Sequence, residues 1–147
     1  MIEIPTLYRT AEEFVEQKFR GANEVLGVLL TGSAASSYPD AGSDIDLEVI
    51  ATENQCMQIG DTCGFEHYHD VDISWEWVTL KELENELKDW KDDVDLWVYS
   101  RSKVLHDTRR GVEAILSEYK QYPTEVWRDK LFLYWFFATG SVPLRFW

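Results

Sequence analysis

A strict alternation of acidic and aliphatic residues is the feature that most limits how this chain can fold. Residues 44–49 read Asp-Ile-Asp-Leu-Glu-Val and follow a turn-rich loop at residues 38–43. An alternation with period two is typical of a half-buried strand, whose successive side chains point to opposite faces. Asp44, Asp46 and Glu48 therefore share one face of the predicted strand. Because like charges repel one another, the pattern favours a bound divalent cation over a merely solvated acidic face.

A second acidic strand is predicted within residues 65–78. Asp72 alternates there with Val71 and Ile73, so that an apolar face is again backed by acids. If the two acidic strands are neighbours, Asp72 joins Asp44 and Asp46 in one cluster. His67 and His69 fall in the same run and share a strand face with Val71. We interpret them as packed or exposed side chains in preference to metal ligands.

The segment before the first acidic strand has the composition of a binding turn. Residues 25–31 form a nearly continuous apolar run, which is typical of a strand buried on both faces. Gly32 and Ser33 follow directly, and small residues at this point let the backbone approach a bound group. If Ser33 begins a short helix, its free amides can hold a phosphate. Taken alone this is a weak signal, because many tight turns use the same residues.

The remaining elements are read from helical periodicity and capping signals. A capping box at Thr79 and Glu82 begins one helix, and Asp107 or Thr108 caps another. Residues 103–106 are predicted to form a short edge strand, and residues 51–64 a loop with a short helix. The helices are expected at residues 10–22, 79–90, 108–119 and 124–139.

The last predicted helix, residues 124–139, is apolar on more than one face. A helix that is apolar all round must be buried on all sides. We therefore expect it to be covered by the preceding domain, by a second copy or another protein, or by a longer chain of which this is the front part.

Composition excludes several classes of function. The chain of 147 residues carries 27 acidic and 14 basic residues, and its formal charge of −13 repels a nucleic-acid backbone. It would attract cationic small molecules instead. Cys56 and Cys63 are too far apart for a Cys-x-x-Cys metal pair and are read as reduced thiols. With no signal peptide and no membrane-spanning run, we expect a cytoplasmic protein with neither nucleic-acid nor membrane partners.

Taken together, these residues resemble the nucleotidyltransferase superfamily related to DNA polymerase beta. The resemblance covers about residues 25–107 and rests on Gly32-Ser33, ten intervening residues, Asp44-Ile45-Asp46-Leu47, and Asp72 on a later strand. The small size and isolated motif look closest to bacterial antibiotic (aminoglycoside-type) or minimal nucleotidyltransferases. Many relatives carry a further glycine and a basic residue after Gly-Ser. Here Ala34 and Ala35 follow, so the phosphate grip would depend on backbone amides and Ser33.

The resemblance implies an α+β fold, with a small mixed or antiparallel twisted sheet flanked by helices and followed by further helices. It implies a nucleotidyltransferase domain over residues 1–107. Residues 108–147 would be a C-terminal helical segment, the start of a truncated helical domain.

The resemblance also implies a mechanism. Asp44 and Asp46 would bind one or two magnesium ions, while Asp72 would be either a further metal ligand or a general base. Gly32 and Ser33 would hold the phosphates of a nucleoside triphosphate, for which we expect ATP. The reaction implied is transfer of a nucleoside monophosphate to a hydroxyl of a small acceptor, such as an aminoglycoside-like antibiotic, with release of pyrophosphate. The basic residues available to the triphosphate are Arg101, Lys103, Arg109, Arg128 and Lys130.

Two other readings stay open at this point. In one, the chain is a minimal nucleotidyltransferase that acts as an antitoxin or regulatory partner of another protein, docking through its aromatic last helix, which could also form a homodimer. In the other, the chain has the fold without turnover. Magnesium-dependent release of pyrophosphate from ATP distinguishes these readings from an antibiotic-modifying enzyme.

Overall fold

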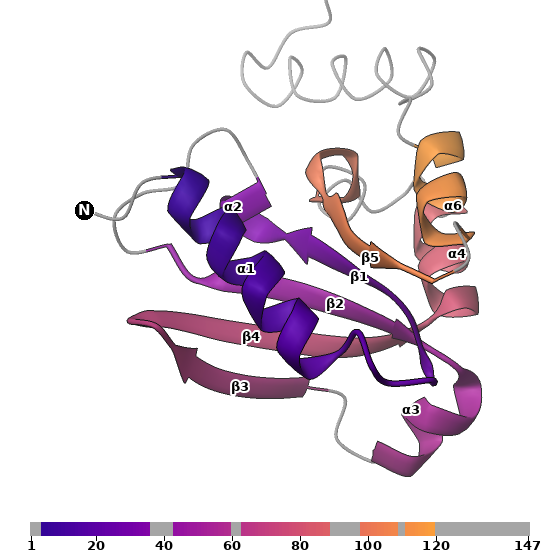
Figure 1. Ribbon diagram of the computed structural model, residues 1–147. Coiled ribbons are helices and arrows are strands. Elements are labelled where there is room, and N and C mark those ends of the chain that lie inside the picture. The colour runs from indigo at the N-terminus through magenta and orange to yellow at the C-terminus, as the bar shows by residue number, and fades with distance from the viewer. Residues whose placement is uncertain (1–3, 36–42, 60–62, 89–97, 109–110, 120–147) are drawn as a thin grey trace, which may run out of the picture.

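A five-stranded mixed sheet forms the centre of the fold (Figure 1). The computed structural model describes residues 4–35, 43–59, 63–88, 98–108 and 111–119. The strands are β1 (Val25–Thr31), β2 (Ile45–Ala51), β3 (Cys63–Tyr68), β4 (Val71–Thr79) and β5 (Lys103–Asp107). The helices are α1 (Ile4–Lys18), α2 (Gly32–Ala35), α3 (Glu53–Ile59), α4 (Leu80–Lys88) and α6 (Gly111–Tyr119), and residues 98–101 are also helical.

The strand order β3-β4-β2-β1-β5 brings the two acidic strands together. Strands β2 and β4 are parallel neighbours, whereas β1–β2, β1–β5 and β3–β4 are antiparallel pairs. The parallel pair requires a crossover, which α3 and β3 provide. The predicted α+β class with a mixed sheet flanked by helices is confirmed.

One face of the sheet, which we call the α1 face, packs against helix α1. Phe14 and Phe19 of that helix meet Trp75 of β4, with ring centroids 5.7 and 5.9 Å apart. Lys18 extends its ammonium over the Trp75 ring at 4.1 Å. The aliphatic residues of the first acidic strand lie in the same cluster, and Ile45 and Val49 are fully buried. This burial is the main reason why the strand keeps its register, because a one-residue slip would bring its acids into the core.

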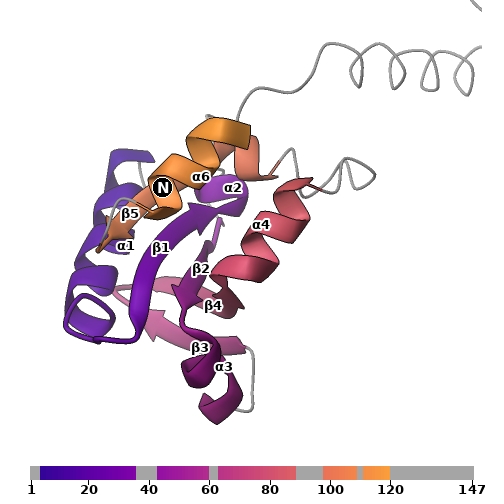
Figure 2. The ribbon, with the colours of Figure 1, turned by 90° about the vertical axis from the view of Figure 1, so that its right-hand side faces the viewer.

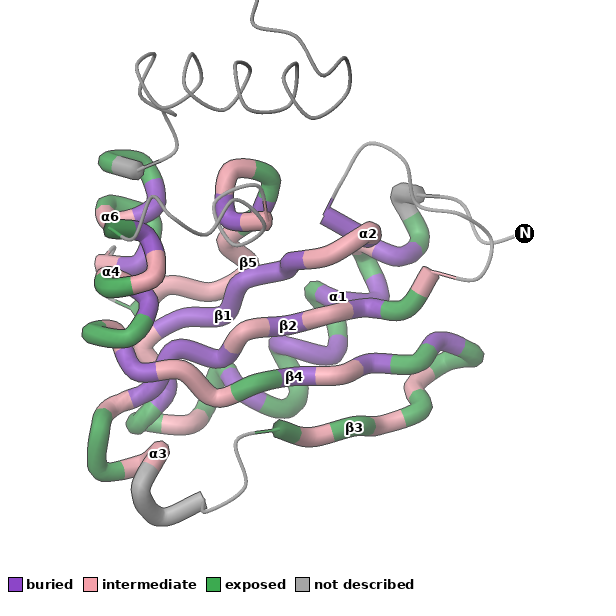
Figure 3. The backbone as a smooth tube through the Cα atoms, turned by 180° about the vertical axis from the view of Figure 1, so that it is seen from behind, coloured by how far each residue is buried: buried purple, intermediate pink, exposed green. Residues whose placement is uncertain are grey.

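The opposite face is the acidic face, and α4 and α6 cover only part of it. Helices α1 and α4 lie on opposite sides of the sheet (Figure 2), and Figure 3 looks onto the acidic face. Leu83, Val112 and Leu116 from the two helices pack on Leu29 and Ile50 of the sheet. The uncovered part carries Asp46, Phe65, His67, Asp72, Ser74 and Glu76.

The run predicted at residues 65–78 is a hairpin, and this changes one expectation. Residues His69 and Asp70 both have positive φ angles, 47° and 64°, and form the two-residue turn between β3 and β4. Such a turn pairs an odd-numbered residue of β3 with an even-numbered residue of β4. Odd-numbered side chains of β3 therefore share a face with even-numbered side chains of β4. His67 therefore pairs with Asp72 on the acidic face, and the expectation that it shares a face with Val71 is wrong.

Helix α1 begins earlier than predicted. It runs from Ile4 to Lys18, whereas the capping pattern favoured residues 10–22. Pro5 lies in its first turn, where a missing amide costs nothing. The predicted inner positions Phe14 and Val15 are buried as expected.

The other local predictions agree with the structure where it describes the residues. Strand β1 has the predicted bounds, α2 begins at the Gly-Ser turn, and β5 is an edge strand. Asp107 caps α6, because its carboxylate accepts hydrogen bonds from the amides of Gly111 and Glu113 at 3.1 and 2.9 Å.

Several predictions concern residues that the structure does not describe. The helix expected at 124–139, and with it the predicted docking surface, lies outside the described residues. The domain division at residue 107 also stays a prediction. None of the helices within the described ranges is long and apolar enough to cross a membrane.

The capping box at the start of α4 yields a prediction about stability. The Glu82 carboxylate accepts hydrogen bonds from the Thr79 amide and hydroxyl, both at 2.8 Å, and these lower the pKa of Glu82. We expect Thr79→Ala to reduce the free energy of unfolding in urea by about 1 kcal/mol at pH 7. Lys81→Ala, in the same turn and exposed, is the control and should change it by less than about 0.5 kcal/mol.

Acidification tests the same prediction independently. A carboxyl whose pKa is lowered by folding stabilises the fold above its unfolded-state pKa, and that contribution is lost as the pH falls through the lowered value. The difference in the free energy of unfolding between wild type and Glu82→Gln should therefore shrink in acid. A difference that stays constant with pH would contradict the role given to Glu82.

Candidate functional site

The predicted Gly-Ser turn lies at the end of β1, directly beside the start of β2. The antiparallel register places Thr31 opposite Asp46, and the Thr31 hydroxyl donates a hydrogen bond to the Asp46 carbonyl oxygen at 3.3 Å. Gly32 follows with a φ angle of +63°, in the left-handed region that residues with a Cβ avoid. A Cβ atom at Gly32 would overlap Oδ2 of Asp46. Glycine is therefore favoured at this position for two reasons, the left-handed backbone angle and the close approach of the Asp46 carboxylate.

Asp46 is half-buried and has a defined orientation. Its Oδ1 atom accepts a hydrogen bond from the Ser74 hydroxyl at 2.9 Å, across the parallel β2–β4 pair. Its Oδ2 atom is the one that lies against Gly32. The carboxylate thus connects the turn after β1 with the second acidic strand. Sequence reasoning did not identify Ser74 as a site residue, although its alternation with Asp72 placed it on the correct face.

Asp44 and Asp72 lie at the same edge of the site and are both exposed. Ile45 pairs with Ile73, so each of these acids comes one residue before a paired position on parallel strands. Asp72 contacts His67 across the hairpin, with Oδ1 of the aspartate 2.7 Å from Nδ1 of the histidine. The structure therefore places Asp46 and Asp72 on one face, each with a partner of its own, and places Asp44 immediately before β2.

The three acids are not gathered into a tight ligand cluster. Within the described residues, no group of three histidine, cysteine, aspartate or glutamate side chains is arranged to hold a metal ion. The donor set still fits magnesium, because hard carboxylate oxygens are the ligands this ion prefers.

A buried tyrosine forms a second polar cluster on the same face. Tyr99 is 4% exposed, and its hydroxyl donates a hydrogen bond to Glu86 of α4. Burial raises the pKa of Tyr99 strongly, and the nearby carboxylates of Glu48 and Glu86 raise it further. The phenol therefore stays protonated and connects the helical turn at residues 98–101 to α4 and β2. Sequence reasoning placed Glu48 on the acidic face but had no signal for its tyrosine neighbour, which lies 51 residues away.

Of the basic residues proposed as triphosphate partners, the structure describes Arg101 and Lys103. Lys103 pairs with Leu30, whose side chain belongs to the α1 face, and its ammonium lies 5.1 Å from the centre of the Tyr8 ring. It therefore faces away from the acids. Arg101 is exposed at the end of the helical turn. Arg109, Arg128 and Lys130 are outside the described residues.

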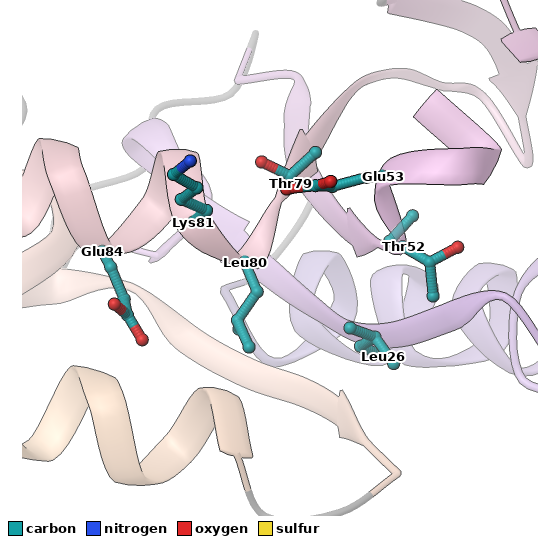
Figure 4. Close-up of a pocket in the computed structure, with 8 residues that line it drawn as sticks. Leu26, Thr52, Glu53, Thr79, Leu80, Lys81 and Glu84 are labelled. Atoms are coloured by element: carbon teal, nitrogen blue, oxygen red, sulfur yellow. The ribbon is translucent and has the colours of Figure 1, made fainter. Parts of the chain in front are cut away.

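A pocket of about 300 Å³ opens at the other end of β2 and β4 (Figure 4). It is lined by residues that include Ala51, Thr79 and Leu80. Ala51 is five residues along β2 from Asp46, which corresponds to about 16 Å of extended strand. Because the Gly32–Ser33 turn and Asp46 lie at the opposite end of β2, we do not place the reaction in this pocket.

Comparison with known proteins supports the fold. No protein-family model and no curated protein matches this sequence. Among solved structures, the fold is similar to the crystal structure of a nucleotidyltransferase-like protein from Exiguobacterium sibiricum 255-15, with a TM-score of 0.54 and 13% sequence identity. The match covers 84% of this chain and 43% of that protein, so the chain spans less than half of its length. The chain therefore has a nucleotidyltransferase-like fold.

The packing of Gly32 on Asp46 makes a direct prediction. Gly32→Ala should reduce the free energy of unfolding by about 1–2 kcal/mol from its left-handed backbone alone, and the overlap with Asp46 should add to this cost. Gly21→Ala is the matched control, because nothing lies within 4 Å of the added Cβ. Urea unfolding of both variants measures the difference.

A double-mutant cycle separates the two costs. In an Asp46→Ala background, the carboxylate is gone and Gly32→Ala should cost only the backbone penalty. If the cost of Gly32→Ala is the same in both backgrounds, the contact with Asp46 does not explain the glycine.

Proposed function

We propose that this chain is a magnesium-dependent nucleotidyltransferase that moves a nucleoside monophosphate, AMP from ATP, onto a hydroxyl of a small acceptor. The observation that carries the proposal is the contact between Gly32 and Asp46, with Asp72 on the parallel neighbouring strand. This joins a turn suited to phosphate with carboxylates suited to a cation. The likeness to a nucleotidyltransferase-like protein supports the fold in which such a site occurs.

Each part of the site has a task in this reaction. Asp44 and Asp46 would hold one or two magnesium ions, and the Gly32–Ser33 turn would bind the terminal phosphates through its amides. Bound magnesium supplies charge neutralisation for the entering and leaving oxygens. Ser74 holds the Asp46 carboxylate in one orientation. Residues that fix a ligand in this way typically contribute about 10–100-fold to metal affinity or activity.

The chemical step is a substitution at the α-phosphorus. The acceptor oxygen forms a bond to phosphorus, the bond to the bridging oxygen breaks, and pyrophosphate leaves. Asp72 is either a further ligand or the base that takes the hydroxyl proton. Its contact with His67 favours the second role, because a carboxylate engaged by a histidine has fewer oxygens for a metal.

The acceptor we propose is a cationic, hydroxyl-bearing compound of the aminoglycoside class. Its support is electrostatic, since the chain has a formal charge of −13 and the exposed part of the acidic face carries Asp72 and Glu76. Long-range attraction of this kind raises the rate of association and weakens with salt.

The carboxylates give the proposal a sharp test. Asp46→Asn, and separately Asp44→Asn, should lower magnesium-dependent release of pyrophosphate from ATP by about 100-fold or more, because several kcal/mol of charge stabilisation are lost. Glu53→Gln is the control, since Glu53 is an exposed acid at the start of α3, at the end of the sheet away from Asp44 and Asp46. The assay uses a panel of aminoglycosides and lincosamides as acceptors.

Three results would contradict this proposal. The first is turnover that does not require magnesium. The second is an equal effect of all three substitutions. The third is the absence of both ATP binding and pyrophosphate release from the wild-type chain.

A further inference from the structure

Phe65 is exposed on the acidic face without an evident structural reason. Its side chain is 67% exposed, and it is the one large hydrophobic residue classed as exposed within the described ranges. A single exposed apolar residue is common on protein surfaces and needs no special explanation. The position of Phe65 relative to the candidate site is what distinguishes it.

The register of the sheet connects Phe65 to the acids. Phe65 of β3 pairs with Ser74 of β4, and the Ser74 hydroxyl bonds to Asp46 of β2. Cross-strand partners in an antiparallel pair project to the same face, so the phenyl ring stands on the acidic face. Two strand spacings separate Phe65 from Asp46, which is about 10 Å. His67, paired with Asp72, stands next to it on the same face of β3.

The proposed reaction indicates which substrate lies over the strip formed by Phe65 and His67 of β3 and their partners Ser74 and Asp72 of β4. The Gly32–Ser33 turn lies on the β1 side of Asp46, so the terminal phosphates would be held there. In a substitution at phosphorus, the entering and leaving oxygens are on opposite sides and roughly in line. Pyrophosphate that leaves toward β1 places the acceptor on the other side of the acids, over β4 and β3. Figure 3 shows that no helix of the described residues crosses these two strands on this face.

We propose that Phe65 is a specificity-determining residue on which a ring of the acceptor stacks. The occupant is a hydroxylated ring with one apolar face, such as a sugar or cyclitol, and His67 lies beside it as a hydrogen-bonding neighbour. The acids Asp72 and Glu76 next to the strip suit amino substituents on that ring. This inference rests on the proposed function, which supplies the direction from which the acceptor enters.

Binding by calorimetry tests the proposal without turnover. The full chain is titrated with kanamycin and with lincomycin in the presence of magnesium and a nonhydrolysable ATP analogue. We expect Phe65→Ala to weaken binding of whichever probe the wild-type chain binds by about 10-fold, which is the size of effect that a lost stacking contact gives. Phe65→Trp should retain binding. Cys63→Ala, an exposed position on the same face of the same strand, should leave it within about twofold of wild type.

The outcomes separate this proposal from the proposed function. If binding depends on Phe65 but no pyrophosphate is released from ATP, the role of Phe65 in ring binding is supported and the proposed transferase activity is wrong. Conversely, if pyrophosphate is released but Phe65→Ala binds the probes as tightly as Cys63→Ala does, only the proposed role of Phe65 is overturned. It is overturned as well if neither probe binds the wild-type chain. A wild-type dimer that Phe65→Ala dissociates in sedimentation would also overturn it, because the ring would then be an interface between two copies.

Discussion

The contact between the Asp46 carboxylate and Gly32 is the constraint on which the proposed site depends. It holds the end of β1, the turn that follows it and the start of β2 in one arrangement. A residue with a Cβ atom is disfavoured at Gly32, because the backbone angle is left-handed and the Asp46 carboxylate would have to move to make room. The same carboxylate is held by Ser74 on β4. A single side chain thereby joins three segments that are far apart in the sequence.

The two faces of the sheet account for how so many acids are tolerated near one another. The aliphatic partners of Asp44, Asp46 and Glu48 are buried on the α1 face, and this burial fixes the register of β2. Asp44, Asp72 and Glu76 are exposed, so water screens the repulsion among these acids. The buried end of that face instead pairs Glu86 with a phenol. The same strands therefore carry buried apolar residues that stabilise the fold and exposed acids that remain available for binding.

The parts of the fold that follow from local patterns could be predicted from the sequence. The bounds of β1, the capping box at Thr79 and the acidic side of β2 each depend on neighbouring residues alone. The phase of β3 could not be predicted, because it depends on two residues adopting positive φ angles in a turn without glycine. The partners of Asp46 and Tyr99 also escaped prediction, since both contacts join separate elements and leave no periodic signal.

In the proposed function, the turn at Gly32 and the acids of β2 form one site for a metal-bound nucleotide. Manganese broadens amide resonances near it, so an NMR titration with a manganese complex of a nonhydrolysable ATP analogue locates the ion directly. We expect selective broadening at Gly32, Ser33, Asp44 and Asp46. Broadening centred on Thr79 and Leu80 at the pocket, or none above the level of free manganese, would contradict it.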